Sequence, residues 1–157
     1  MTTTARKVLA DCKTVHSLLE MESDAAHFRV LWVSGSALLR SVGHVLQKVD
    51  SKHSSKVAKS VDAAWKRWNA DKETNAIFFE FIEEERNNIL KEYEFGFLSG
   101  PVEVLITPSN TLFALEDNLY CPISGGRFEG EDCRDILAEG IAWWERELST
   151  IDSHRGG

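Results

Sequence analysis

The stretch TNAIFFEFIEEERNNILKEYE, residues 74–94, predicts a long amphipathic helix. Its apolar side chains recur at intervals of three and four residues, which places them on one face of a helix. They are Ile77, Phe78, Phe81, Ile82, Ile89 and Tyr93. Such a helix buries its apolar face against other helices, and the chain supplies three more segments with the same period.

These three segments precede it, with apolar faces at residues 8–19, 28–49 and 57–68. The second is crowded with small residues around Gly35, and small side chains allow a neighbouring backbone to approach closely. Four amphipathic helices with short connections predict a mostly α-helical protein, with a four-helix bundle over residues 1–96.

The pattern changes beyond this bundle. A β-branched run at residues 102–106 is bounded by prolines, and residues 112–115 can return as a second strand, so we expect a small β-hairpin. Asp132 can cap a C-terminal helix. We expect residues 97–157 to pack on the bundle as part of a single domain, because they are too few for a core of their own.

Tryptophan side chains could serve either the core or a ligand. Trp65 and Trp68 fit the apolar face of their helix, and they could also stack on bases. Trp143 and Trp144 are neighbours, so their side chains point about 100° apart on a helix. We therefore expect only one of these two to face inward.

The charge of the chain is uneven. Its 157 residues include 18 basic and 25 acidic ones, for a net charge of −7, which disfavours binding a polyanion with the whole surface. Between residues 40 and 72, however, eight basic residues accompany only three acidic ones. Lys59, Lys66 and Arg67 lie in this segment, and they form either a local RNA-binding face or an ordinary solvated helix surface.

Composition excludes several classes of protein. No apolar run of about eighteen residues exists, and no secretory signal is visible, so neither a membrane span nor export is expected. Cys12, Cys121 and Cys133 are too scattered for a disulfide framework. Neither cysteine nor histidine shows metal-ligand spacing. We expect a cytoplasmic protein with no metal and no cofactor.

Arg86 is the most unusual polar residue of the 74–94 segment. It lies at the edge of the apolar face, and Asn87 and Lys91 can line the same groove. An arginine there must be hydrogen-bonded, so it forms either a buried ion pair with a glutamate or a clamp for phosphate. Arg40 and His44, one turn apart on their helix, could approach Arg86 across the bundle.

The sequence FEFIEEERNNILKEY, residues 79–93, resembles the last helix of HEPN domains, which are small helical proteins. Their signature is an arginine, a polar residue that is often asparagine, several more residues and then a histidine. Residues 27–48 are similar to the preceding long helix of bacterial HEPN-like proteins, and Trp68 also suits that group. The likeness spans residues 28–93.

The resemblance implies a HEPN-like four-helix bundle that forms a homodimer. Many HEPN proteins are metal-independent RNases, in which arginine and histidine from two subunits meet at the 2′-hydroxyl and the scissile phosphate. Arg86 and Asn87 match the signature, whereas Lys91 stands where the family has its histidine. An ordinary lysine stays charged and donates only, so the resemblance implies anion binding rather than proton transfer at this position.

Three functions are compatible with these residues. The first is a bacterial HEPN-like protein that binds RNA, a nucleotide or a cognate protein partner through the groove around Arg86. The second is a metal-independent endoribonuclease of the toxin–antitoxin or defence type, which uses Arg86 and Asn87 with a lysine or a histidine from elsewhere. The third is a structural interaction module in which Arg86 belongs to a core ion pair.

Overall fold

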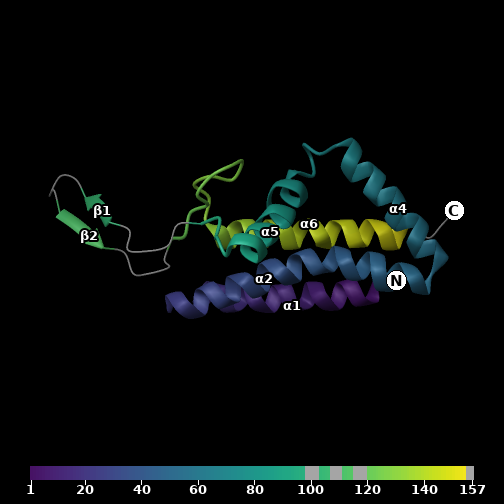
Figure 1. Ribbon diagram of the computed structural model, residues 1–157, viewed down its shortest axis with the longest axis horizontal. Helices are drawn as coiled ribbons and strands as arrows, with labels where there is room; N and C mark the ends of the chain where they lie inside the picture. Colours follow the sequence, from purple (N-terminus) through teal and green to yellow (C-terminus); the bar gives the residue numbers. More distant parts are fainter. Residues whose placement is uncertain (98–102, 107–110, 115–119, 155–157) are drawn as a thin grey trace.

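The computed structural model describes residues 1–97, 103–106, 111–114 and 120–154, and these are mostly helical, as predicted (Figure 1). In chain order the elements are α1 (Thr3–Met21), α2 (Ala25–Val45), the π-helix η1 (Leu46–Asp50), α3 (Ser51–His53), α4 (Ser55–Ala70), the π-helix η2 (Ile77–Ile82), α5 (Glu83–Glu92), β1 (Glu103–Ile106), β2 (Thr111–Ala114) and α6 (Cys133–Ser153). No described helix combines the length and the apolar character that crossing a membrane requires.

The helix at the centre of the arrangement is α6. Figure 1 shows α1, α2 and α6 running side by side, and α6 also contacts α4 and η2. Its buried face therefore joins two groups of helices, and Trp144 and Leu148 are fully buried there. The C-terminal helix that the sequence predicts as an addition to the bundle thus completes the core.

Three helices begin where a polar side chain accepts a hydrogen bond from their first turn. Asp24 accepts from the backbone N–H of His27 at the start of α2, at 2.9 Å. Ser54 begins α4 in the same way, and Asp132 begins α6. Such caps satisfy backbone donors that have no partner within the helix, which explains why these elements start at these residues.

The first turn of α1 is instead capped by side chains from distant elements. The two carboxylate oxygens of Asp50 accept from the N–H groups of Thr4 and Ala5, at 3.0 and 2.9 Å. Asp152 accepts from the N–H and the hydroxyl of Thr2, at 3.0 and 2.8 Å. Carboxylates are favourable here because the N-terminus of a helix carries partial positive charge.

Trp143 and Trp144 are both buried, with 2% and 0% of their surface exposed. The Trp144 indole N–H donates to the Leu39 carbonyl on α2, and that of Trp143 donates to the side chain of Asn75, each at 3.0 Å. The prediction that only one of them faces inward is wrong. Because α6 lies between α2 on one side and α4 and η2 on the other, two neighbouring faces of this helix are covered.

Two of the predicted helices contain π-helical turns. The predicted second helix runs from α2 directly into η1, and the predicted fourth helix begins as η2 and continues as α5. The fourth ends at Tyr93, which adopts a left-handed conformation with φ of 54° and is 61% exposed. The expectation that Tyr93 belongs to the buried face is wrong, because this residue lies beyond the last helical turn.

The two strands pair with each other in antiparallel register, with Val104 opposite Phe113. Their predicted end residues, 102 and 115, lie outside the described residues. Within the described ranges, the strands contact each other and no helix. The packing of the hairpin on the helices therefore stays a prediction.

Candidate functional site

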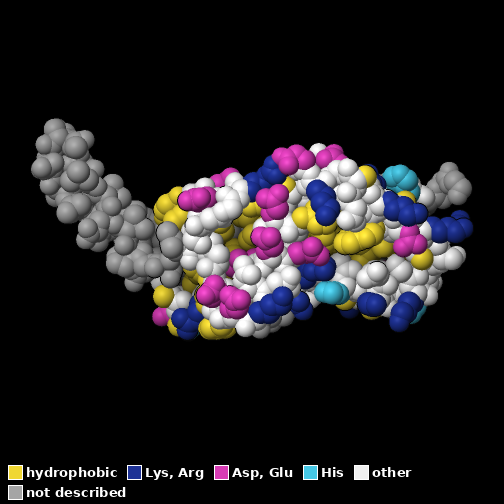
Figure 2. Space-filling view, turned by 45° about the horizontal axis from the view of Figure 1, so that its top comes forward, with side chains coloured by type: hydrophobic (Ala, Val, Ile, Leu, Met, Phe, Trp, Pro, Cys, Tyr) yellow, Lys and Arg dark blue, Asp and Glu magenta, His cyan; other side chains and the backbone are white. Residues whose placement is uncertain are grey.

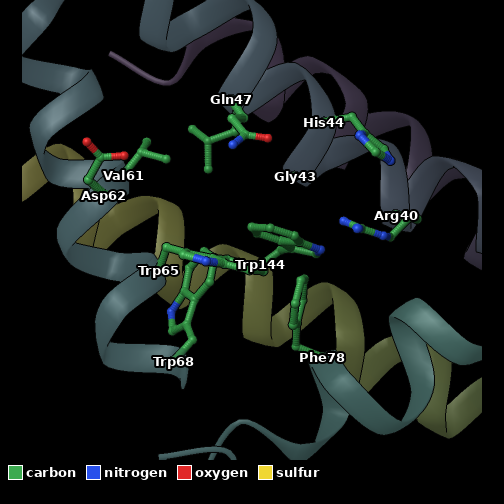
Figure 3. Close-up of a pocket in the computed structure, with 11 residues that line it drawn as sticks. Arg40, Gly43, His44, Gln47, Val61, Asp62, Trp65, Trp68, Phe78 and Trp144 are labelled. Carbon is green, nitrogen blue, oxygen red and sulfur yellow. The ribbon is translucent and has the colours of Figure 1, made fainter. Parts of the chain in front are cut away.

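A pocket of about 130 Å³ opens between α2, η1, α4, η2 and α6. Figure 3 shows Arg40 and His44 on one side of it and Asp62 and Trp65 on the other, with Trp144 between them. Figure 2 shows a face of the molecule on which apolar side chains occupy a hollow that charged side chains border. The pocket is smaller than the roughly 300–1,000 Å³ of sites that enclose a whole drug-sized ligand, so it suits one flat ring.

The wall of this pocket is aromatic. Trp65, Trp68, Phe78 and Trp144 line it, and the Phe78 ring lies 5.9 Å from that of Trp65 and 5.8 Å from that of Trp144. Trp68 is buried, as predicted for a core residue, whereas Trp65 is 45% exposed. Trp65 therefore keeps a ring surface available to a ligand.

Gly43 allows the indole of Trp144 to lie against the backbone of α2. A Cβ atom at residue 43 would stand 3.1 Å from the Trp144 ring, which is closer than ordinary contact. The absence of a side chain at this position therefore helps to shape the pocket floor. Both π-helical segments border the same space, η1 with Gln47 and η2 with Phe78, and π-helical turns are frequent at functional sites.

Arg40 is half-buried at the edge of the aromatic wall. Its guanidinium lies 5.6 Å from the centre of the Phe78 ring, and one of its nitrogens pairs with a Glu83 carboxylate oxygen at 3.0 Å. Burial lowers the pKa of Arg40, and the charge of Arg86 lowers it further, against the opposing effect of Glu83. Arg40 stays charged, because an arginine pKa is so high.

His44 lies one turn further along α2 and is exposed. Partial burial lowers its pKa, and the charges of Arg40, Arg86 and Lys48 lower it further. The imidazole is therefore neutral at pH 7, where it can donate one hydrogen bond and accept another.

Arg86 is half-buried on α5 and donates to the side-chain oxygen of Asn87 at 3.1 Å. It forms no ion pair with a carboxylate of the described residues, because the glutamates near it have other partners. Glu83 pairs with Arg40, and Glu85 turns into the core. Arg86 thus has guanidinium N–H groups that pair with no described carboxylate, and its positive charge lowers the pKa of both Arg40 and His44.

The other predicted binding residues do not line this pocket. Lys91 is exposed in the last turn of α5, and Lys59 and Lys66 are exposed on α4. Arg67 pairs with Glu147 of α6, which also accepts from the indole of Trp68 at 2.7 Å. Of the predicted binding residues, the structure therefore places Arg40 and His44 at the pocket, and the charge of Arg86 acts on both although Arg86 does not line it. The lysines lie on other surfaces.

Several lining residues were not foreseen as site residues, among them Gly43, Gln47 and Asp62. Gly43 and Gln47 do carry a signal in the sequence, because they fall three and seven residues after Arg40 and share its face of the helix. Asp62 similarly precedes Trp65 by three residues. What the sequence does not show is that these two helix faces meet.

Comparison with known proteins finds no family model that matches the chain, no similar curated protein and no similar solved structure. Among the described residues, no group of three or more His, Cys, Asp or Glu side chains could hold a metal ion. The pocket instead offers stacking surfaces for a flat ring and nitrogen donors for an anion, two features that nucleotides combine.

Proposed function

We propose that the protein binds a nucleotide, either free or as one unit of an RNA strand. The base lies against the aromatic wall, and the phosphate lies at the edge formed by Arg40, His44 and Arg86. The observation that carries this proposal is the meeting of the exposed Trp65 ring with Arg40 and His44 at one pocket. The charge of Arg86 acts on both of these side chains from α5.

Each part of such a ligand has a matching group. Stacking of a base on an aromatic side chain contributes about 1–3 kcal/mol, and Trp65 is the partly exposed ring available for it. A guanidinium presents parallel donors that suit phosphate oxygens. Arg40 lines the pocket and offers this guanidinium, although it shares its charge with Glu83. Arg86 pairs with no described carboxylate, and its positive charge adds to that of Arg40.

A HEPN-like four-helix bundle, a homodimer and a bacterial cytoplasmic setting are further parts of this proposal. Contact between Arg86 and Asn87 on α5 agrees with the signature that carries the resemblance. In a dimer, the same groove would meet its counterpart in the second subunit, and two phosphates of one RNA strand could be bound. A cognate protein partner would then act by covering this opening.

Binding is tested by titrating nucleoside monophosphates and short RNA oligonucleotides while tryptophan fluorescence is recorded. We expect quenching of Trp65 and an affinity that falls as salt is raised, since phosphate contacts release counterions. Replacing Arg40 by glutamine should weaken binding at least tenfold. The matched control is Arg29→Gln, an exposed arginine on the same helix, which should bind as the wild type does. A folded wild type that binds none of these ligands would overturn the proposal.

One observation favours a second candidate, the metal-independent endoribonuclease. His44 and Arg40 line the same pocket, and the lowered pKa of His44 favours its neutral form, so an acceptor for the 2′-hydroxyl proton lies beside a guanidinium that can donate to the phosphate. Mixed RNA incubated in EDTA should then yield 2′,3′-cyclic phosphate ends. These ends should be absent with Arg86→Ala and with His44→Ala, and present with His53→Ala. Binding without cleavage would exclude this candidate.

A further inference from the structure

The loop that leads into α6 brings two cysteines together. Pro122 and Asp132 form an isolated antiparallel bridge, so Cys121 and Cys133 occupy directly opposed positions beside it. The Cys133 N–H donates to the Cys121 carbonyl at 2.9 Å, and the Cys121 N–H donates to the Asp132 carboxylate at 3.0 Å. Both strands of this bridge are thus held in register.

The placement of the two side chains suits a disulfide. Opposed residues of an antiparallel pair have Cα atoms about 4.5–5.5 Å apart, and cysteines joined by a disulfide span about 4.4–6.8 Å. Both side chains are buried, with 1% and 0% exposed, and a hydrogen bond joins the two thiols. No disulfide links the three cysteines, all of which lie in the described residues.

We infer that Cys121 and Cys133 are a redox-active pair that forms a reversible disulfide when the protein meets a peroxide. This inference is independent of nucleotide binding, because neither cysteine lines the aromatic pocket. Spacing along the chain does not indicate this pair, since eleven residues separate the two positions and only the bridge makes them neighbours.

The pKa values of the two thiols are shifted in opposite directions, which bears on which of them reacts first with the peroxide. The hydrogen bond from Cys133 and the charge of Arg134 lower the pKa of Cys121 despite its burial. Burial raises the pKa of Cys133. The charge of Asp132 opposes the lowering at Cys121. A thiolate is the reactive form, so we assign the first step to Cys121, while the opposed positions of the two thiols allow the same disulfide whichever sulfur reacts first.

The reaction balances with one peroxide for each disulfide. The Cys121 thiolate attacks one oxygen of hydrogen peroxide, and the O–O bond breaks. Hydroxide is the leaving group, and Cys121 becomes a sulfenic acid. The Cys133 sulfur then attacks the Cys121 sulfur, its proton passes to the departing oxygen, and water leaves as the S–S bond forms. Two thiols and one peroxide give one disulfide and two waters.

The inference requires that a peroxide reaches the buried thiols, and we expect it to do so when the loop between them opens. Its tip is exposed from Ser124 to Arg127, and Arg127 holds it by ion pairs to Glu73 and Glu80. Opening of this loop is a local event that leaves the helices packed. A disulfide would close this loop covalently at its base.

Peptide mapping of the peroxide-treated wild-type chain tests the inference directly. We expect the mass of the protein to fall by two hydrogens, and one cross-linked peptide to contain Cys121 and Cys133. Thiols that can be titrated after unfolding should fall from three to one. The oxidised form should melt about 5–10 °C higher, and dithiothreitol should reverse the shift.

Cys12 is the internal control, because it is fully buried on α1 and burial raises its pKa to about 12. Cys12→Ala should still lose two hydrogens, whereas Cys133→Ser should stop at the sulfenic acid of Cys121. A chain that keeps three thiols after treatment, or one that cross-links through Cys12, would overturn the inference. Mapping of the wild type decides this even where a variant fails to fold.

Discussion

At the scale of single residues, the charge of His44 depends on neighbours from another helix. Arg40 is one turn away on α2, but Arg86 belongs to α5, and no sequence spacing relates them. The helical period correctly put Arg86 at the edge of an apolar face. The lack of an ion pair at Arg86 with any described carboxylate could not be predicted in this way, because it depends on tertiary contacts. Glu83 pairs with Arg40, and the side chain of Glu85 is buried in the core.

The proximity of Arg86 to His44 predicts a change in the pKa of His44. Arg86→Gln removes a positive charge, so the protonated imidazole becomes easier to form and the pKa of His44 should rise. NMR titration of the imidazole resonances measures it. The control is Lys91→Gln on the same helix, which should leave this pKa unchanged. If the pKa of His44 is the same in Arg86→Gln as in the wild type, the two side chains are not close enough in solution to interact.

The same shift affects stability. A histidine whose pKa is lowered by folding binds fewer protons folded than unfolded, so its contribution to stability is present above the unfolded pKa and is lost as the pH falls below it. His44→Gln should therefore show a smaller loss of stability between pH 7 and pH 5.

We expect Gly43→Ala to lower both the free energy of unfolding and the affinity for a nucleotide. The added methyl would stand 3.1 Å from the Trp144 ring, so the indole must shift by a few tenths of an ångström. Trp144 is fully buried and cannot shift freely, so we expect overpacking of about 1–3 kcal/mol to outweigh the roughly 1 kcal/mol that alanine gains over glycine inside a helix. Urea denaturation measures the free energy of unfolding, and nucleotide titration measures the binding. The matched control is Gly125→Ala, where no atom lies within 4 Å of the added group. Equal stability of the two variants would contradict the described position of Trp144.

At the scale of the elements, α5 is attached to its surroundings through Glu85. Its carboxylate is buried and accepts from the indole N–H of Trp32 on α2, at 2.7 Å, and from the Gly96 N–H, at 3.0 Å. Burial raises the pKa of Glu85, although both hydrogen bonds oppose the shift. The sequence shows Glu85 only as one of three consecutive glutamates, so its burial could not be predicted from it.

At pH 7, Glu85→Ala should lower the free energy of unfolding, whereas Glu85→Gln should not. Alanine leaves two buried donors without an acceptor, at a cost of about 1–3 kcal/mol each. Glutamine keeps an acceptor and removes a buried charge, so this variant should be at least as stable as the wild type. Because folding raises the pKa of Glu85, the wild type loses stability as the pH rises through its folded pKa, and the glutamine variant should not. Urea denaturation at several pH values separates these outcomes.

The elements themselves were largely predictable, and their irregular parts were not. Periodicity, and the cap at Asp132, indicate the helices correctly, because both act locally. The period used for prediction assumes a regular α-helix throughout, so it does not locate the π-helical turns of η1 and η2. The pocket lies between α2, α4, α6 and these turns, and it was missed because only tertiary contact brings its residues together.

At the scale of the whole molecule, Asp152 connects the end of α6 to the start of α1. Burial alone would raise its pKa, but hydrogen bonds from Thr2 and Arg6 outweigh it and hold the pKa of Asp152 below its ordinary value. Its contribution to stability is therefore present above the ordinary carboxyl pKa, and it is lost as the pH falls through the lower, folded value.

Asp152→Asn should lower the melting temperature at pH 7 and should flatten its dependence on pH between 5 and 3. Asparagine can still accept one hydrogen bond, but the charge that favours Arg6 and the α1 terminus is gone. Thermal melts across this range measure the effect. Asp11→Asn, an exposed position on α1, should melt as the wild type does. If the melting temperatures of the wild type and both variants fall equally as the pH is lowered, Asp152 does not stabilise the start of α1 in the way described.

The central position of α6 has a consequence for the order in which the chain is made. A ribosome synthesises residues 133–153 after every other described helix, so the nascent chain carries the apolar faces of α1, α2, α4 and η2 before their common partner exists. Until Trp144 emerges, Gly43 and Leu39 border an unfilled space. We expect chains stalled before residue 133 to be held by chaperones, and the native state to form in one late step.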